Sequence, residues 1–140
     1  MKDQVWWITG ASSGIGAALA RALAARGAKL ILSGRNVEAL EAVAADCATE
    51  TLVLPFESTD YDALPAIAGQ AWGWQGHIDG LVNNAGISQR SLAIETGFVV
   101  YQQIIAVDLL APIALTQQVL PRMVGAGGGQ IIAISSVAGI

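Results

Sequence analysis

Charged residues are scarce in this chain of 140 residues. They make up 13% of the sequence, where soluble domains carry about 25%. Seven lysines and arginines stand against eleven aspartates and glutamates, which gives a net charge of -4. A nucleic-acid surface needs a basic stripe to neutralise phosphates, so this balance argues against a nucleic-acid partner.

Cysteine and histidine are nearly absent, with one residue of each, Cys47 and His77. A disulfide framework needs paired cysteines, so a fold built on disulfides is excluded. His77 has no other metal-ligating residues around it in the sequence, and we expect it in a surface loop and expect no metal site. We interpret Cys47 as a packing residue of a helix, because nothing near it marks a reactive thiol.

The sequence also lacks a long uninterrupted apolar run, although 54% of it is hydrophobic. A membrane-spanning helix needs about 20 apolar residues with almost no interruption. The longest apolar stretch, roughly 98–120, is broken by Tyr101, Gln102, Gln103, Asp108 and Pro112. The first residues lack the apolar segment and cleavage site of a signal peptide. We therefore expect a cytoplasmic protein without a membrane partner.

Segments of strand and helix character alternate along the whole chain. This alternation predicts a three-layer α/β/α fold with a parallel sheet of about five strands, joined by right-handed crossovers. The strands are continuous apolar runs, as expected when helices cover both faces of a sheet. We expect strands at 5–9, 29–33, 51–56, 78–82 and 130–135, and helices from Ile15 to the stop signal Gly27 and at 37–48, 60–74 and 97–124.

A glycine cluster, Gly10-Ala11-Ser12-Ser13-Gly14-Ile15-Gly16, separates the first strand from the first helix. Such a turn directs backbone N–H groups and the positive end of the helix dipole toward an anion, and it needs no lysine. We assign the tight turn to Gly10, the approach of backbone to a pyrophosphate to Gly14, and close helix–strand packing to Gly16. The alternative is a glycine-rich turn that binds nothing.

The second strand ends in Ser33-Gly34-Arg35, roughly 20 residues after the glycine turn, where the adenosine ribose of a dinucleotide is bound. An acidic residue there would bind the two ribose hydroxyls of NAD. A guanidinium instead binds a 2′-phosphate through two hydrogen bonds. Arg35 therefore favours NADP over NAD, unless it is simply a solvated residue at the start of a helix.

Three motifs together resemble the short-chain dehydrogenase/reductase family: Thr9-Gly10-Ala11-Ser12-Ser13-Gly14-Ile15-Gly16, Asn83-Asn84-Ala85-Gly86 and Ile134-Ser135-Ser136-Val137-Ala138-Gly139. They occur in family order, and the resemblance covers essentially the whole chain. The stretch Gly86-Ile87-Ser88-Gln89-Arg90-Ser91-Leu92 also resembles the branch that contains the dehydrogenase/reductase member 7 proteins. The resemblance implies a Rossmann fold with strand order 3-2-1-4-5 and one NAD(P)-binding domain over 1–140. It also implies hydride transfer between NAD(P)(H) and a small alcohol or carbonyl substrate.

The same resemblance implies which residues contact the cofactor. Glu57 stands where the family usually has an aspartate that holds the adenine amino group, and its longer side chain leaves its placement open. Asn84, Ala85 and Gly86 would lie against the cofactor ribose. The diphosphate turn would consist of Gly10, Gly14 and Gly16, lined by Ser12, Ser13 and Ile15.

Two further positions are implied to take part in catalysis. Ser136 aligns with the serine that hydrogen-bonds the substrate oxygen, and its neighbour Ser135 is the less favoured choice. Asp108 stands where the family usually has an asparagine of a proton relay. The alternative for Asp108 is a polar residue satisfied by helix backbone or water.

The tyrosine and lysine of the family's catalytic motif would follow Ser136 beyond Ile140. We therefore expect the chain to be the N-terminal part of such an enzyme, inactive alone, with a sheet that lacks the family's last strands. The alternative is a non-catalytic dinucleotide-binding or assembly module. Without the family's last strands, strand 130–135 would be an apolar edge and helix 97–124 would lose cover. We expect this surface to be covered by another copy of the chain, in a homo-oligomer, or by sequence absent from these 140 residues.

Overall fold

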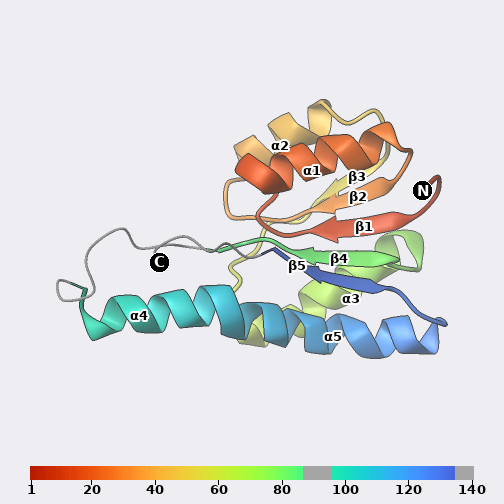
Figure 1. The fold of residues 1–140 in the computed structure, drawn as a ribbon. Helices are drawn as coiled ribbons and strands as arrows, with labels where there is room; N and C mark the ends of the chain where they lie inside the picture. The colour runs from red at the N-terminus through yellow and green to blue at the C-terminus, as the bar shows by residue number, and fades with distance from the viewer. Residues whose placement is uncertain (87–95, 135–140) are drawn as a thin grey trace.

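All five predicted strands pair in parallel in the computed structural model, which describes residues 1–86 and 96–134. The order β3-β2-β1-β4-β5 confirms the predicted Rossmann topology (Figure 1). In register, Trp7 of the central strand lies beside Ile31 on one side and Leu81 on the other. The strands are β1 Val5–Ile8, β2 Lys29–Leu32, β3 Thr51–Val53, β4 Gly80–Asn83 and β5 Gln130–Ala133.

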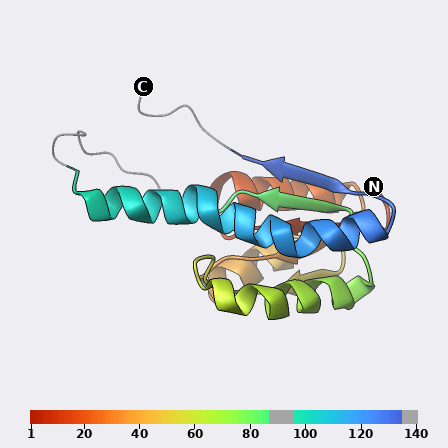
Figure 2. The same cartoon turned by 90° about the horizontal axis from the view of Figure 1, so that it is seen from below.

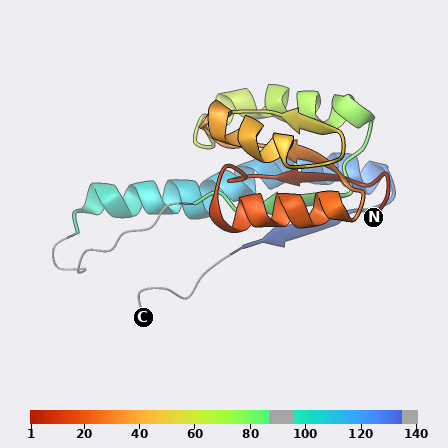
Figure 3. The ribbon, with the colours of Figure 1, turned by 90° about the horizontal axis from the view of Figure 1, so that it is seen from above.

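Helices cover the sheet on both faces, as the continuous apolar strands require. Helices α1 and α2 lie on one face, and α3 and α5 lie on the other (Figures 1 and 3). The helices are α1 Gly14–Ala25, α2 Val37–Ala45, the 3₁₀ helix η1 Tyr61–Ala63, α3 Leu64–Gln75, α4 Phe98–Ile105, the π-helix η3 Ala106–Leu110 and α5 Ala111–Gly125.

Two adjacent tryptophans of β1 pack into the hydrophobic cores on opposite faces of the sheet. Successive side chains of a strand point to opposite sides. Trp6 accordingly belongs to the core beneath α1 and α2, and Trp7 belongs to the core against α3 and α5. The indole of Trp6 lies directly against Gly80, where a Cβ atom would run into the ring. The indole N–H of Trp7 donates to the Ser33 hydroxyl at 2.8 Å.

The third strand is shorter than its apolar run. We expected it to reach Phe56, but β3 ends at Val53. Pro55 has no N–H to contribute to a sheet. The chain nevertheless stays beside β2 past this point, because Leu54 N donates to Leu32 O at 2.9 Å and Phe56 N donates to Gly34 O.

The predicted helix at 97–124 is one continuous helix, formed by α4, η3 and α5. Pro112 has no N–H to donate to the carbonyl of Asp108, so an α-helical hydrogen bond is missing here. The helix widens at this point, and Ala111 N donates to Ala106 O, five residues back. Such π segments arise where the α-helical ladder is interrupted.

The two halves of this helix have different surroundings. Four side chains of α5 are buried beneath the sheet: Ala111, Leu115, Val119 and Met123. No residue of α4 is buried, and this part projects past the ends of the strands (Figure 2). Among the described residues, Phe98–Gly125 is the one helix whose length and composition would allow it to cross a membrane. A core helix of a soluble protein passes the same criteria, but only 11% of the most apolar window of this helix is buried.

Candidate functional site

A cleft of about 820 Å³ opens at the carboxyl ends of the strands. Its walls are the segments that follow β1, β2, β3 and β4, together with the facing side of α4 and η3. The order β3-β2-β1-β4-β5 reverses direction between β1 and β4. Open α/β sheets bind their ligands in the crevice at such a reversal. The topology therefore places the cleft where a ligand is expected.

The glycine turn after β1 borders this cleft through Gly10, Ser12 and Ser13. Gly10 has φ +61° and Gly14 has φ +57°, a left-handed conformation that glycine adopts without strain. Ser13 is the N-cap residue of α1, but its side chain makes no capping hydrogen bond. No acidic residue lies in the first turn of α1 either. The first N–H groups of α1, which follow directly after Ser13, therefore have no capping side chain of their own.

Close backbone packing holds the glycine turn against the loop after β4. A Cβ atom on Gly16 would run into the carbonyl of Gly10 and would come within 2.6 Å of Asn84 Nδ2. A Cβ atom on Gly10 would lie 2.9 Å from Ala85 Cα. Both positions therefore require glycine for space, whereas nothing lies within 4 Å of the corresponding position on Gly14.

Hydrogen bonds tie the same two loops together. Asn84 Nδ2 donates to Gly10 O at 3.1 Å. The hydroxyl of Thr9 accepts from the backbone N–H groups of Asn84 and Ala85 at 3.0 and 3.1 Å, and it donates to Val82 O. The Asn84 side chain is thus engaged in holding the turn in shape.

An ion pair lies at the part of the cleft formed by the loops after β2 and β3. Arg35 Nη1 lies 3.4 Å from Glu57 Oε2, and Thr59 Oγ1 donates to Glu57 Oε1 at 3.4 Å. The side chain of Arg35 is 75% exposed and that of Glu57 is 45% exposed. Both charges therefore remain accessible to a ligand.

The π-helix brings Asp108 to the end of the β4 loop. A Cβ atom on Gly86 would lie 3.1 Å from Asp108 Oδ1, so the carboxylate lies directly against the backbone there. On the same helix Gln103, Ala106 and Val107 line the cleft. This side of the cleft thus combines one amide with apolar surface.

The structure brings together most of the residues that the sequence marked as a site. Gly14, Ile15 and Gly16 do not line the cleft, although they belong to the adjoining turn, and Ile15 is 61% exposed. Ser135 and Ser136 lie outside the described residues. The predicted residues that line it are Gly10, Ser12, Ser13, Arg35, Glu57, Asn84, Ala85 and Gly86.

Several lining residues were missed from the sequence. Those on the strand-end loops follow from the rule that parallel strands present their carboxyl ends at one edge. No local signal marks those on the helix. Thr9, Ser33 and Gly34 stand in the quoted motifs but were assigned no contact of their own. The residues missed altogether are Asn36, Phe56, Ser58, Thr59, Gln103, Ala106 and Val107.

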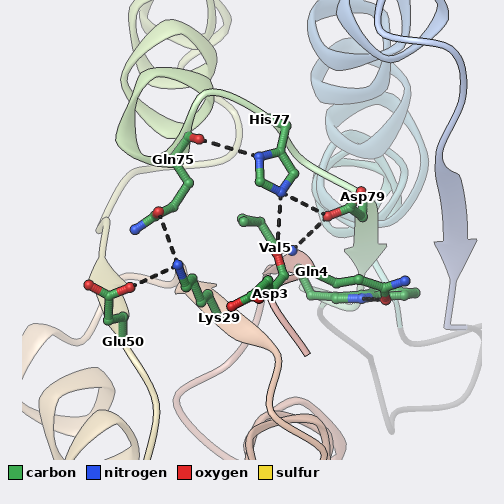
Figure 4. Close-up of polar contacts among 9 residues, drawn as sticks. Asp3, Gln4, Val5, Lys29, Glu50, Gln75, His77 and Asp79 are labelled. Carbon is green, nitrogen blue, oxygen red and sulfur yellow. Dashed lines mark hydrogen bonds and ion pairs between the residues drawn. The ribbon is translucent and has the colours of Figure 1, made fainter. Parts of the chain in front are cut away.

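Polar side chains also gather at the opposite end of the sheet, where the strands begin (Figure 4). Lys29 Nζ lies 3.1 Å from Glu50 Oε2 and donates to Gln75 Oε1. His77 Nε2 lies 3.2 Å from Asp79 Oδ2, which also accepts from Val5 N at 2.8 Å. These groups are satisfied by one another. Within residues 1–86 and 96–134, no group of three or more potential ligands is arranged to hold a metal ion.

Comparison with known proteins agrees with the fold and the motifs. The family model described as short chain dehydrogenase matches residues 4–140. Dehydrogenase/reductase SDR family member 7 of Homo sapiens is 41% identical over all of this chain and 43% of its own length. Member 7B of Bos taurus is 36% identical over 99% of this chain and 46% of its own length. The chain thus spans less than half the length of these relatives.

Solved protein structures also match nearly the whole chain. A metagenomic short-chain oxidoreductase in complex with NADP is 38% identical, with a TM-score of 0.86 over 98% of this chain and 64% of its own. Levodione reductase is 31% identical, with a TM-score of 0.93 over 98% of this chain and 55% of its own. The chain belongs to the short-chain dehydrogenase/reductase family, within which it resembles members 7 and 7B.

Proposed function

We propose that this chain is the dinucleotide-binding part of an oxidoreductase that transfers a hydride between a nicotinamide cofactor and a small alcohol or carbonyl substrate. One observation carries the proposal. The glycine turn and the loop after β4 are locked together at the point where the strand order reverses, beside a cleft of about 820 Å³. Family membership supports oxidoreductase chemistry and gives no support to a purely structural module.

The residues of the cleft fit a dinucleotide. The start of α1 has no capping side chain and no acidic residue, and the hydroxyls of Ser12 and Ser13 stand beside it. Free N–H groups at a helix start stabilise a phosphate by hydrogen bonding and by the helix dipole. We propose that this turn holds the diphosphate and that Asn84, Ala85 and Gly86 lie against a ribose. The bound cofactor would supply or accept the hydride.

We further propose that NADP is preferred to NAD. Arg35 lines the cleft with an exposed guanidinium, a group that binds a phosphate monoester in two hydrogen bonds. The solved relative in complex with NADP supports the same choice. An aspartate or glutamate at the end of β2, which would favour NAD, is replaced here by Gly34.

Fluorescence titration with NADPH and NADH tests this proposal. The wild-type chain should bind NADPH, and Arg35→Ala should weaken NADPH by about tenfold or more while changing NADH little. Arg21→Ala is the matched control, because Arg21 makes an exposed ion pair with Asp46 outside the cleft. Equal losses for both dinucleotides would refute the phosphate-binding role, and no binding of either by wild type would refute the function.

Catalysis needs more than these 140 residues provide under our proposal. Ser136 would hydrogen-bond the substrate oxygen, and Asp108 would take part in proton transfer near Gly86. General acid–base catalysis requires a proton donor whose pKa is matched to the working pH, and we propose that sequence outside this chain supplies it. The 140-residue chain should then bind NADPH without reducing carbonyl compounds, and reduction by this chain alone would contradict the proposal.

We also propose that the protein is a homo-oligomer. Large apolar side chains remain exposed along the long helix, among them Phe98 at 75% and Leu109 at 54%. Edge strand β5 exposes Ile131 and Ile132. Size-exclusion chromatography with light scattering should give a mass of at least twice 14.4 kDa, and a stable monomer would refute this assembly. The cytoplasmic location and the absence of a membrane partner stay predictions.

A further inference from the structure

Among the described residues that line the cleft, two carry charged side chains, and these lie on neighbouring loops and neutralise each other. Arg35 follows β2, Glu57 follows β3, and their charged atoms are 3.4 Å apart. Thr59 donates to the other carboxylate oxygen of Glu57, again at 3.4 Å. One carboxylate oxygen of Glu57 therefore contacts the guanidinium, and the other accepts a hydrogen bond from Thr59.

This pair does little for the stability of the fold. Its partners are 75% and 45% exposed, and exposed ion pairs are weakened by water and by the loss of side-chain freedom. The two charges instead attract or repel any charged ligand group that enters this part of the cleft. A ligand phosphate that binds Arg35 also comes near the Glu57 carboxylate, which lies 3.4 Å from the guanidinium, so attraction and repulsion oppose each other.

We propose that Glu57 limits the selectivity of this cleft for a 2′-phosphorylated dinucleotide. The inference rests on the proposed function, in which the cleft binds NADP through Arg35. Glu57 occupies the guanidinium when no phosphate is present and repels the phosphate when it arrives. The protein consequently binds both dinucleotides, with a preference for NADPH that is smaller than Arg35 alone would give.

The sign of the effect separates this role from the one that family resemblance implies for the position. A carboxylate that holds the adenine amino group contacts a part shared by both dinucleotides, so its removal weakens NADH and NADPH equally. A carboxylate that opposes the 2′-phosphate acts on NADPH alone, and its removal strengthens binding. The ratio of the two dissociation constants therefore reports the role directly.

The test measures dissociation constants for NADPH and NADH in wild type, Glu57→Gln, Glu57→Ala and Glu57→Asp. Both neutral variants should bind NADPH about three- to tenfold more tightly, because a carboxylate a few ångströms from a phosphate that carries up to two charges is removed. NADH should change by less than about twofold on the same argument, since it has no 2′-phosphate. Glu57→Asp keeps the charge and should keep the ratio close to that of wild type.

Glu50→Gln provides the matched control. It removes one carboxylate from an ion pair of similar length, with Lys29, at the opposite end of the sheet (Figure 4). It should leave the NADPH to NADH ratio unchanged, which separates a local effect from one of net charge. Circular dichroism of each variant verifies that it is folded.

A second pair of probes isolates the phosphate. The fragments 2′,5′-ADP and 5′-AMP differ by the 2′-phosphate, and Glu57→Gln should strengthen binding of the first fragment only. Parallel weakening of NADH and NADPH in the neutral variants, or an unchanged ratio, overturns the inference while the proposed function stands. Failure of wild type to bind either dinucleotide overturns both.

Discussion

Asn84 Nδ2 donates a hydrogen bond of 3.1 Å to the carbonyl oxygen of Gly10, which joins the loop after β4 to the glycine turn after β1. These two loops are 74 residues apart in sequence, and they form the two sides of the strand-order reversal. Because Gly16 packs against the same two groups, the shape of the turn depends on this contact. The candidate phosphate site is therefore held by a long-range hydrogen bond as well as by its own glycines.

Asn84→Asp should loosen this junction. The substitution removes the amide donor and places a carboxylate against the carbonyl oxygen of Gly10. The loss of a partly buried hydrogen bond, with repulsion in its place, should lower the free energy of unfolding by about 1–3 kcal/mol. Urea denaturation followed by circular dichroism measures the change.

Asn36→Asp is the matched control for that change. The Asn36 side-chain oxygen accepts from Ala39 N at the start of α2, and an aspartate oxygen serves equally well as an N-cap acceptor. Its stability should stay within about 0.5 kcal/mol of wild type. Equal losses of unfolding free energy at both positions would mean that the Asn84–Gly10 hydrogen bond does not specifically stabilise the fold.

Gly16→Ala adds only one methyl group, but it should destabilise the protein clearly. The added Cβ meets the backbone carbonyl of Gly10 and the side-chain amide of Asn84, and this amide is held in place by its hydrogen bond to Gly10 O. Overpacking against backbone costs about 1–3 kcal/mol, and the displaced turn should also bind NADPH more weakly. Both the unfolding free energy and the NADPH titration should show the loss.

Gly73→Ala gives the opposite expectation within the same fold. Gly73 lies in α3 with nothing within 4 Å of its Cβ position. Alanine in an open helical position stabilises by about 0.5–1 kcal/mol, because it restricts the unfolded chain. If both glycines responded alike, the proposed steric reason for Gly16 would be wrong.

Much of this fold could be predicted because its information is local. Continuous apolar runs, glycine turns and helical spacing gave the order of elements, and the motifs gave the strand order. The extent of the core is less local: Ile15, Leu19 and Leu23 have the four-residue spacing of one apolar helix face. In the structure Leu23 is buried, whereas Ile15 lies in the first turn of α1 and is 61% exposed. Hydrophobic spacing does not say how far along a helix the core extends.

The site was predictable in part for the same reason. Glycines and the asparagine are marked by their motifs, but the Arg35–Glu57 pair arises only when the loops after β2 and β3 meet. The π segment was not predictable either. Pro112 marks a missing hydrogen bond, yet proline can kink or end a helix as well as widen it. In the structure the helix continues through a π segment into α5, which packs beneath the sheet, and no local pattern records that packing.

Ser33→Ala tests the buried polar contact on the central strands. Trp7 and Ser33 are both fully buried, and the indole N–H donates to the hydroxyl at 2.8 Å. Removing the hydroxyl leaves a buried donor without its acceptor, which should cost about 1–3 kcal/mol of unfolding free energy. In a double-mutant cycle, Trp7→Phe and Ser33→Ala should cost less together than the sum of their separate effects. Strict additivity would show that the bond does not stabilise the fold.

Cys47 gives the protein a stability that depends on pH in alkaline solution. The residue is 9% exposed, and its thiol donates to Val43 O at 3.3 Å. Burial raises its pKa above the usual 9.0, opposed by the nearby Arg21 guanidinium and reinforced by Asp46. The unfolded chain therefore loses this proton at a lower pH than the folded chain does. Since the unfolded state then binds fewer protons, the free energy of unfolding should fall as the pH rises above about 9.

Cys47→Ala isolates this contribution from the tyrosines and lysines that titrate in the same range. The variant should lose a constant amount of stability from the missing sulfur, and its unfolding free energy should fall less steeply than that of wild type above about pH 9. Wild-type Cys47 should also react slowly with a thiol reagent at pH 8 and rapidly in urea, because the thiolate is the reactive form. Parallel pH curves for the two proteins, or rapid labelling of the folded chain, would show that burial does not hold this thiol in its neutral form.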